Sequence, residues 1–274
     1  MHICYALIFD TKKTILGSKS LNMIEIFVLS IIQGVTEFLP ISSSSHLILA
    51  SKYLNFQNQN LSIDVSLHIG SFLAVLFYFK LEVLNFIKNK ELFLKIFLSS
   101  IPVMIVGYFL IKFDLIDHLR NIKTIGWMTV IFGVFLYLSD KSQNLKKIGN
   151  DFDYKAVILI GLLQVFALVP GVSRSGVTIT AARLLNFERL DSAKISFLLS
   201  IPTLGAVSFF GIKNLVNTDS FQFSLVNYLS IFLSFVFSLI TIKYFLKYIK
   251  KFSLNVFVGY RLILGILILV FAYF

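Results

Sequence analysis

Apolar runs of about 16 to 20 residues follow one another from residue 23 to the end of the chain, separated by short polar stretches. Six runs are long enough for a helix to cross a bilayer, which takes about 20 apolar residues. They cover about 63–79, 92–111, 124–139, 193–211, 225–242 and 255–274. A membrane-spanning β-barrel would instead alternate apolar and polar residues over strands of about ten residues. The pattern therefore predicts an all-α polytopic membrane protein.

Four shorter apolar runs come in two pairs, 24–39 with 43–54 and 154–169 with 176–186. A polar stretch that contains a proline, Pro40 or Pro170, separates the members of each pair. Backbone that is not helical is tolerated at membrane depth only where protein or a water-filled cavity satisfies its polar groups. We therefore expect two re-entrant helix–loop–helix pairs with the polar stretches at their tips.

The two halves of the chain, about 23–139 and 154–274, resemble each other. Each contains one re-entrant pair followed by three long runs. Because three is odd, the second half must be inverted relative to the first, so we expect one membrane-embedded domain, 23–274, built as an inverted-topology repeat. Interrupted segments in corresponding places predict a site near the membrane midplane. The local matches are Gln33 to Pro40 with Ser43 against Gln164 to Pro170 with Ser173, and Phe97 to Pro102 against Phe197 to Pro202.

Residues 1–22 differ from the rest of the chain. A short apolar piece ends at Asp10 and a stretch rich in Lys and Ser follows. The segment lacks the charged start and the small-residue cleavage site of a signal peptide. Two interpretations stay open, a peripheral N-terminal extension or an upstream start with Met23 as the true first residue.

Composition narrows the class of protein. Hydrophobic residues make up 57% of the 274 residues and charged residues only 14%, against about 25% charge in soluble domains. This excludes a soluble globule and an intrinsically disordered chain. The net charge of +11 comes mostly from lysines in the short loops, which favours lipid headgroups over nucleic acid as the partner. The single cysteine, Cys4, excludes an intramolecular disulfide and a Cys-based metal site.

Loop lysines and arginines predict the orientation, because they concentrate on the cytoplasmic side of membrane proteins. In the predicted topology one side carries Lys80, Lys88, Lys90, Lys141, Lys146, Lys147, Lys155, Arg183, Arg189, Lys194, Lys243, Lys247, Lys250 and Lys251. The other side carries the shorter set of Lys12, Lys13, Lys19, Lys52, Lys112, Arg120, Lys123 and Lys213. We expect the first side to be cytoplasmic, with both termini and the mouth of the first re-entrant pair outside.

The first polar stretch is a strong chemical signal, because ionisable groups at membrane depth are costly and usually functional. Gln33 and Glu37 are four residues apart and share a helix face. The serines from Ser42 onward cap the second helix of the pair and leave its free N–H groups facing the break. Ser43 and His46 are three residues apart, so one helical turn is expected to bring them together.

The second polar stretch forms a candidate oxyanion cradle. Arg174 offers a planar fork of N–H donors for phosphate oxygens. Gly171 and Gly176 permit close approach of the backbone to a ligand. Hydroxyl groups and the N–H groups that open the following helix add further donors. The hydroxyls belong to Ser173, Ser175 and Thr178.

Together the two stretches place a carboxylate, a histidine, an arginine and many hydroxyls between the halves. A lipid with a phosphate head fits, with its head at Arg174 and its tail leaving sideways into the bilayer. Such groups serve phosphoryl transfer, often with a divalent metal. A transporter of lipid phosphates would use the same cradle, but it needs no nucleophile beside a candidate base. An ion channel is disfavoured, because no filter-like carbonyl loop or charge ring is visible.

At these residues the chain resembles the undecaprenyl pyrophosphate phosphatase family, also called bacitracin-resistance proteins. Gln33, Glu37, Phe38 to Ser43 and His46 match the family's first motif, and Pro170 to Thr178 matches the second in full. Tyr260-Arg261 also looks like the family, and the resemblance runs from about Met23 to Phe274.

Two departures from the family pattern affect the first motif. Many members have Glu where this chain has Gln33, which weakens any metal site made of two carboxylates. Members commonly have Thr-Gly where this chain has Ser44-Ser45, so the tip loses a glycine and its backbone is expected to change.

The resemblance implies an undecaprenyl-diphosphate phosphatase that supplies the monophosphate carrier for peptidoglycan synthesis and confers bacitracin resistance. The alternative is a flippase of polyprenyl phosphates without hydrolysis. The enzyme would lie in the bacterial cytoplasmic (inner) membrane with its active site outside. Its partners would be a polyprenyl diphosphate lipid and membrane lipids, not nucleic acid, and a homodimer is left open.

The resemblance also implies roles for individual residues. Glu37, Ser43, His46 and Arg174 are the expected catalytic residues. A divalent metal, Mg²⁺ or Ca²⁺, would be held by Glu37 and Gln33. The nucleophile stays open between His46, through a phosphohistidine, and Ser43 with His46 as its base. The expected substrate-binding residues are Ser42, Gly171, Ser173, Arg174, Ser175, Gly176 and Thr178.

Four further polar residues lie in or beside apolar runs. Asp64 and His68 are four residues apart on the first long run and are placed to pair with each other. Arg183 and Arg261 are expected to be anchors or partners behind the site.

Overall fold

The computed structural model describes residues 23–53, 61–88, 90–113, 119, 121–216 and 223–274. Within these ranges the chain is helical and forms no β-strand, as the apolar pattern predicted. The segment 1–22, for which two interpretations stay open, lies outside the described residues.

Six long apolar helices confirm the six predicted spans. Each has 18 residues or more, enough to cross most of the hydrocarbon core of a bilayer. A chain with six such helices is a multi-pass membrane protein. They are α4 (Leu61–Tyr78), α6 (Lys90–Lys112), α8 (Ile122–Asp140), α12 (Arg189–Val216), α13 (Leu225–Ile249) and α14 (Asn255–Tyr273).

The two broken pairs also form. The first is α2 (Met23–Thr36) with α3 (Ser43–Tyr53). The second is α10 (Tyr154–Gln164), continued by the 3-10 turn η2 (Val165–Leu168), with α11 (Arg174–Leu184). The segment between the two helices of each pair, called the break below, contains a proline, Pro40 or Pro170. Proline interrupts a helix because it lacks an N–H group and disfavours helical backbone in the residue before it. Two short helices, α5 (Lys80–Lys88) and α9 (Ile148–Asp151), were not predicted, because neither contains an uninterrupted apolar run.

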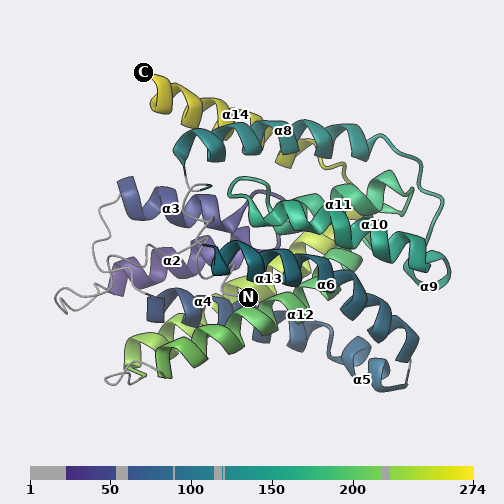
Figure 1. Cartoon of the computed structure of the whole chain (residues 1–274), viewed down its shortest axis with the longest axis horizontal. Coiled ribbons are helices and arrows are strands. Elements are labelled where there is room, and N and C mark those ends of the chain that lie inside the picture. Colours follow the sequence, from purple (N-terminus) through teal and green to yellow (C-terminus); the bar gives the residue numbers. More distant parts are fainter. Residues whose placement is uncertain (1–22, 54–60, 89, 114–118, 120, 217–222) are drawn as a thin grey trace.

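The helices of the two halves pack in a reciprocal pattern (Figure 1). α2 packs against α13 as α10 packs against α6, and α4 packs against α13 as α12 packs against α6. The helices α4 and α12 contact each other, as do α8 and α14. Exchanging the two halves helix by helix maps these contacts onto one another or onto themselves. The packing of α11 against α8 and α12 does not follow the exchange, because the described part of α3 packs mainly against α2. The inverted relation of the halves stays a prediction.

The two long helices that contain proline do not follow this order. Pro102 lies inside α6 and Pro202 inside α12. The sequence matched the segments that end in these two prolines. When the first half is matched helix by helix to the second, however, α4 corresponds to α12 and α6 corresponds to α13. The two Ile-Pro segments therefore agree in local sequence and not in helix order.

The backbones of α4 and α13 approach each other closely at Gly70, the one glycine of α4. A Cβ atom on Gly70 would lie 2.4 Å from the carbonyl oxygen of Ile231. Beside this point, the Ser234 hydroxyl donates to the Leu67 carbonyl at 2.7 Å. Small and hydroxyl-bearing residues are typical of helix contacts in membranes, because the hydrophobic effect does not drive helices together in lipid.

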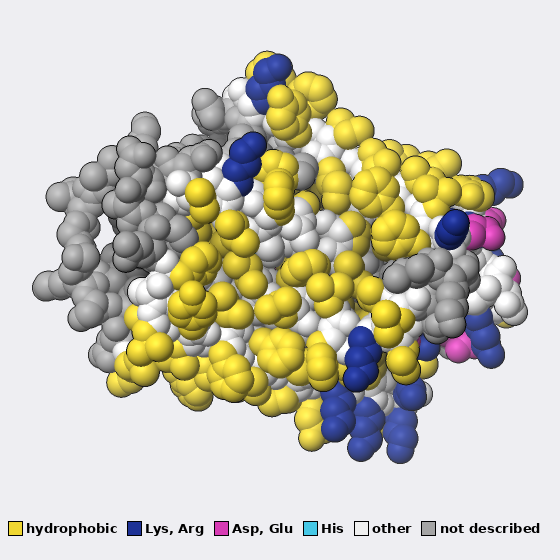
Figure 2. All heavy atoms as spheres, turned by 90° about the horizontal axis from the view of Figure 1, so that it is seen from below, with side chains coloured by type: hydrophobic (Ala, Val, Ile, Leu, Met, Phe, Trp, Pro, Cys, Tyr) yellow, Lys and Arg dark blue, Asp and Glu magenta, His cyan; other side chains and the backbone are white. Residues whose placement is uncertain are grey.

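The surface matches a lipid environment. Figure 2 shows a face covered largely by hydrophobic side chains, with most of its Lys and Arg toward the right-hand end. Large apolar side chains such as Leu225 and Phe271 are 83% and 71% exposed. Apolar area on this scale is typical of a surface that faces acyl chains rather than water.

We expect Gly70→Ala to lower the melting temperature of the protein in detergent by several degrees. The added Cβ overlaps the Ile231 carbonyl, and overpacking of this kind costs about 1–3 kcal/mol. Gly259→Ala in α14 is the matched control, because a Cβ there meets no atom within 4 Å. Alanine is also the better helix former by about 1 kcal/mol. Equal melting temperatures for the two variants would contradict the close contact.

Candidate active site

The two breaks meet at a buried guanidinium, that of Arg261 on α14. Arg261 is fully buried. It donates to the carbonyl oxygen of Pro40 in the first break at 3.1 Å, and to those of Gly171 and Val172 in the second at 2.8 and 3.0 Å. One guanidinium thus donates hydrogen bonds to carbonyl oxygens that have no helical partner in either break. Arg261 is the anchor behind the site that the sequence predicted.

A serine with left-handed backbone precedes the second helix of each pair. Ser42, before α3, has a φ of 76°, and Ser173, before α11, has a φ of 71°. Residues other than glycine seldom adopt this conformation. The sequence had matched Ser43 with Ser173, but the backbone matches Ser42 with Ser173, because the second break has one more residue after its proline. Ser43 then corresponds to Arg174, and each is the first residue of its helix.

The Glu37 carboxylate receives donors from both breaks. Its Oε1 accepts from Arg174 at 2.8 Å. Its Oε2 accepts from the Ser43 hydroxyl at 2.8 Å and from the Gln33 amide at 3.1 Å. Glu37 lies between α2 and α3, outside the six long helices. Burial by itself would raise the pKa of the Glu37 carboxyl, but neighbouring Arg174 and His68 and the hydrogen bonds from Arg174 and Ser43 hold that pKa below its usual value. The ion pair with Arg174 thus favours the charged form of the Glu37 carboxylate.

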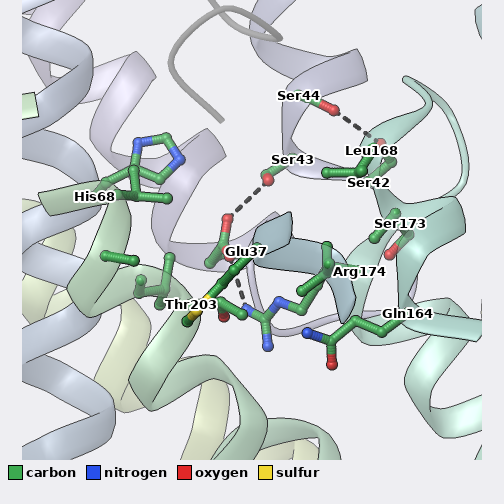
Figure 3. Close-up of a pocket in the computed structure, with 16 residues that line it drawn as sticks. Glu37, Ser42, Ser43, Ser44, His68, Gln164, Leu168, Ser173, Arg174 and Thr203 are labelled. Atoms are coloured by element: carbon green, nitrogen blue, oxygen red, sulfur yellow. Dashed lines mark hydrogen bonds and ion pairs between the residues drawn. The ribbon is translucent and has the colours of Figure 1, made fainter. Parts of the chain in front are cut away.

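These groups border a pocket of about 100 Å³ (Figure 3). Its polar lining is Glu37, Ser42, Ser43, Ser44, His68, Gln164, Ser173, Arg174 and Thr203. Its apolar lining is Val103, Met104, Ala167, Leu168, Leu204, Ala206 and Val207. The residues that follow Pro102 and Pro202 belong to this lining, so both Ile-Pro segments border the pocket. A polar end beside an apolar wall suits a ligand with a charged head and a hydrocarbon tail.

The predicted pairing of Ser43 with His46 is wrong. The Ser43 hydroxyl turns back to Glu37, whereas His46 has its Nδ1 2.6 Å from the Ser42 carbonyl and its Nε2 2.6 Å from the Tyr260 hydroxyl. The His46 and Tyr260 rings also stack, with an interplanar angle of 11°. His46 does not line the pocket. The base within hydrogen-bonding reach of Ser43 is Glu37.

Several residues predicted to bind substrate shape the second break instead. A Cβ on Gly171 would lie 2.5 Å from the Ile125 carbonyl, so its backbone approaches α8 rather than a ligand. The Gly176 N–H group is already bonded to the Ser173 hydroxyl at 3.1 Å. The Ser175 hydroxyl donates across to the first break, to the Leu39 carbonyl at 2.7 Å. Of the predicted set, Ser42, Ser173 and Arg174 line the pocket.

Thr178 also has a structural contact. Its hydroxyl donates to the hydroxyl of Ser196 on α12 at 2.7 Å. The carbonyl of the same serine accepts from Arg174 at 3.1 Å. Ser196 therefore joins α11 to α12 and holds the guanidinium of Arg174 in place.

The two departures from the family pattern have clear positions. Gln33 holds Glu37 through its amide N–H, and its Oε1 is buried without a hydrogen-bond partner in the described part of the chain. Ser45 lies in the first turn of α3, with its hydroxyl 2.9 Å from that of Ser42. Ser45 has no positive φ, so the backbone at this position does not require the glycine that other members carry. Helical backbone accepts serine without steric cost.

Four polar pocket residues were not predicted as site residues: Ser44, His68, Gln164 and Thr203. His68 was expected to pair with Asp64, and its Nδ1 lies 2.8 Å from the Asp64 backbone carbonyl. Gln164 carried one signal in the sequence, its match with Gln33 in the other half. Thr203 carried one as well, since it directly follows Pro202 of the repeated Ile-Pro segment.

The donors around Glu37 fit a metal ion only when a ligand completes the site. Within the described ranges, no three His, Cys, Asp or Glu side chains group closely enough to hold a metal by themselves. Of the two predicted ligands, Glu37 lines the pocket and Gln33 lies behind it, with an Oε1 that has no partner in the described part of the chain. Mg²⁺ commonly takes one or two carboxylates and completes its shell with water and substrate phosphates. The expected metal is compatible with this set in the presence of a phosphate ligand.

We expect Arg261→Lys to lower the melting temperature by about 5–10 °C, because each buried carbonyl left without a donor costs about 1–3 kcal/mol. Hydrolysis of a polyprenyl diphosphate, the activity that the sequence predicts, should fall as well, since the two tips lose their shared donor. Arg183→Lys is the matched control. Arg183 is also fully buried, but it bonds Asn144 and the Asp140 carbonyl, away from the pocket. Equal hydrolysis by both variants below their melting temperatures would contradict the anchoring role.

Comparison with known proteins agrees with the motifs. Residues 26–267 match the model of the family described as bacitracin resistance protein BacA. The undecaprenyl-diphosphatase of Pelagibacter ubique (strain HTCC1062) is 50% identical over 253 residues, covering 92% of this chain and 98% of that protein. The undecaprenyl-diphosphatase of Jannaschia sp. (strain CCS1) is 37% identical over 266 residues, covering 92% and 100%. That of Aliivibrio salmonicida (strain LFI1238) is 39% identical over 256 residues, covering 88% and 95%. This chain therefore belongs to the bacitracin resistance protein BacA family.

Proposed function

We propose that this protein is an undecaprenyl-diphosphatase, which hydrolyses the terminal phosphate of undecaprenyl diphosphate and releases undecaprenyl phosphate. The relatives carry this name, and one feature of the pocket supports it directly. A serine hydroxyl donates to an ionised carboxylate that is itself paired with an arginine. That arrangement supplies a nucleophile, a base and a cation at one place.

The pocket suits both ends of this substrate. Arg174 and the start of α11 face the diphosphate, because a helix N-terminus and a guanidinium both favour anions. Two N–H groups of the Arg174 guanidinium bond Glu37 and the Ser196 carbonyl, so the cation is oriented before substrate arrives. The apolar residues of α6 and α12 offer a surface for the first isoprene units. The rest of the chain of the lipid lies in the bilayer.

The geometry favours Ser43 as the nucleophile. Its oxygen attacks the terminal phosphorus, and its proton passes to Glu37 along the 2.8 Å hydrogen bond. The bond from that phosphorus to the bridging oxygen breaks, and undecaprenyl phosphate leaves. A water molecule then attacks the phosphoserine, inorganic phosphate leaves, and the serine oxygen regains a proton. Arg174 neutralises charge on the phosphate oxygens in both steps.

His46 acts at a distance in this scheme. Its contacts with the Ser42 carbonyl and Tyr260 fix the start of α3, and Ser43 is the next residue after Ser42. His46 therefore positions the nucleophile rather than accepting its proton. A divalent ion held by Glu37, Gln33 and substrate would supply further charge neutralisation to the diphosphate.

We also propose the setting predicted from the sequence. The protein lies in the bacterial cytoplasmic membrane with its pocket open to the outside, because Lys and Arg are more numerous on the opposite side. In that position it would recycle the lipid carrier for cell-wall synthesis and confer bacitracin resistance. A homodimer stays a prediction.

Purified protein in detergent should release phosphate from undecaprenyl diphosphate. We expect Arg174→Ala to reduce turnover at least ~100-fold, because it removes charge neutralisation of the transition state. Excess chelator should also reduce turnover if the proposed metal takes part, and added Mg²⁺ or Ca²⁺ should restore it. Protein that binds the lipid but releases no phosphate with any metal would contradict a diphosphatase and favour a flippase.

The covalent intermediate identifies the nucleophile. With substrate labelled in the terminal phosphate, an acid quench should trap label on wild-type protein, because phosphoserine survives acid and phosphohistidine does not. Ser43→Ala should abolish both the label and turnover. His46→Ala should still be labelled and lose less than the ~100-fold typical of a proton-transferring residue. Label that survives alkali but not acid would identify His46 instead.

A further inference from the structure

Gln164 is a pocket residue for which the proposed reaction has no role so far. It is the last residue of α10, just before the turn that leads into the second break. It is fully buried and lines the pocket. Figure 3 shows its amide beside the guanidinium of Arg174, with Glu37 on another side of that guanidinium.

The amide of Gln164 has no hydrogen-bond partner in the described part of the chain. Both its Oε1 and its Nε2 are buried and unpaired. Burying an amide without partners is unfavourable, and nearly all buried polar side chains in proteins are hydrogen-bonded. Because the unpaired amide borders a pocket, a ligand in that pocket is placed to supply what the protein does not.

The matching residue of the other half shows the contrast. Gln33 uses its Nε2 to hold Glu37 at 3.1 Å, so it positions the base. Gln164 holds no catalytic side chain. The two glutamines that the sequence matched therefore differ in their contacts, and only Gln164 has both amide atoms free for a ligand.

The chemistry of the pocket indicates which part of a diphosphate meets Gln164. Ser43 and Glu37 lie on the first break, so the phosphorus that is attacked must sit there. Arg174 reaches Glu37 from the second break. A diphosphate that lies across Arg174 places its other phosphate on the Gln164 side. An ionised phosphate only accepts hydrogen bonds, and the Nε2 of Gln164 is a neutral donor for it.

We propose that Gln164 is a substrate-binding residue that donates to the phosphate retained by the lipid product. This inference rests on the proposed diphosphatase function and extends it. Gln164 distinguishes the diphosphate by binding its second phosphate, while the residues around Ser43 act on the first. The lipid monophosphate product makes the same contact, so Gln164 also contributes to product binding.

The test compares Gln164→Met with Gln33→Met, a matched pair of nearly isosteric changes. Three quantities are measured on the full chain in detergent: the melting temperature, KM and kcat for undecaprenyl diphosphate, and the rise in melting temperature caused by farnesyl phosphate. Gln164→Met should keep or raise the melting temperature, because it removes an unpaired buried amide. Its KM should rise about tenfold to 100-fold with kcat within a few-fold of wild type. The stabilisation by farnesyl phosphate should shrink.

Gln33→Met should instead lower kcat and leave KM close to that of the wild type, because Glu37 loses a positioning hydrogen bond. An unchanged KM and an unchanged response to farnesyl phosphate in Gln164→Met would overturn the inference. A lower melting temperature and lower kcat at constant KM would also overturn it, since they would make Gln164 structural. Wild-type protein that neither hydrolyses undecaprenyl diphosphate nor responds to farnesyl phosphate would instead overturn the proposed function.

Discussion

Two helices that break inside the protein leave carbonyl groups that must find donors there, and Arg261 supplies a donor group for both breaks at once. In hydrocarbon each unpaired carbonyl is costly. Because its guanidinium donates to Pro40, Gly171 and Val172, the two tips cannot separate without leaving buried carbonyls unpaired. The residue that does this comes from α14, the last helix of the chain, so segments far apart in the sequence meet at this contact.

The same contact brings the chemical groups together. Once the tips meet, Glu37 of one break lies within 2.8 Å of Arg174 of the other. A buried ion pair by itself adds little stability, because desolvation offsets much of the attraction between the charges. Its value here is preorganisation. In the proposed mechanism the carboxylate of Glu37, the hydroxyl of Ser43 and the guanidinium of Arg174 are thus held together before a diphosphate arrives, so little reorganisation is needed.

The two halves share a scaffold but not a chemistry. Ser42 and Ser173 have the same unusual backbone, and the residue after each starts a helix and bonds Glu37. In the first half that residue is Ser43, the proposed nucleophile, and in the second it is Arg174, a cation. The glutamines differ in the same way, since Gln33 holds Glu37 and Gln164 faces the pocket unpaired. A near-symmetric fold thus presents a substrate with one reactive side and one binding side.

The sequence by itself determined the six spans and the two broken pairs, because long apolar runs leave few alternatives. It also predicted Glu37, Ser43 and Arg174 as site residues, and all three line the pocket. It did not determine which groups meet. Spacing along a helix suggested that Ser43 pairs with His46, but contacts across the breaks aim Ser43 at Glu37 and His46 at Tyr260. Likewise only packing shows that Arg261 joins both tips and that Gln164 enters the pocket. The direction in which a side chain points, and the group that it contacts, depend on segments that are distant in the sequence. Only the tertiary structure brings those segments together.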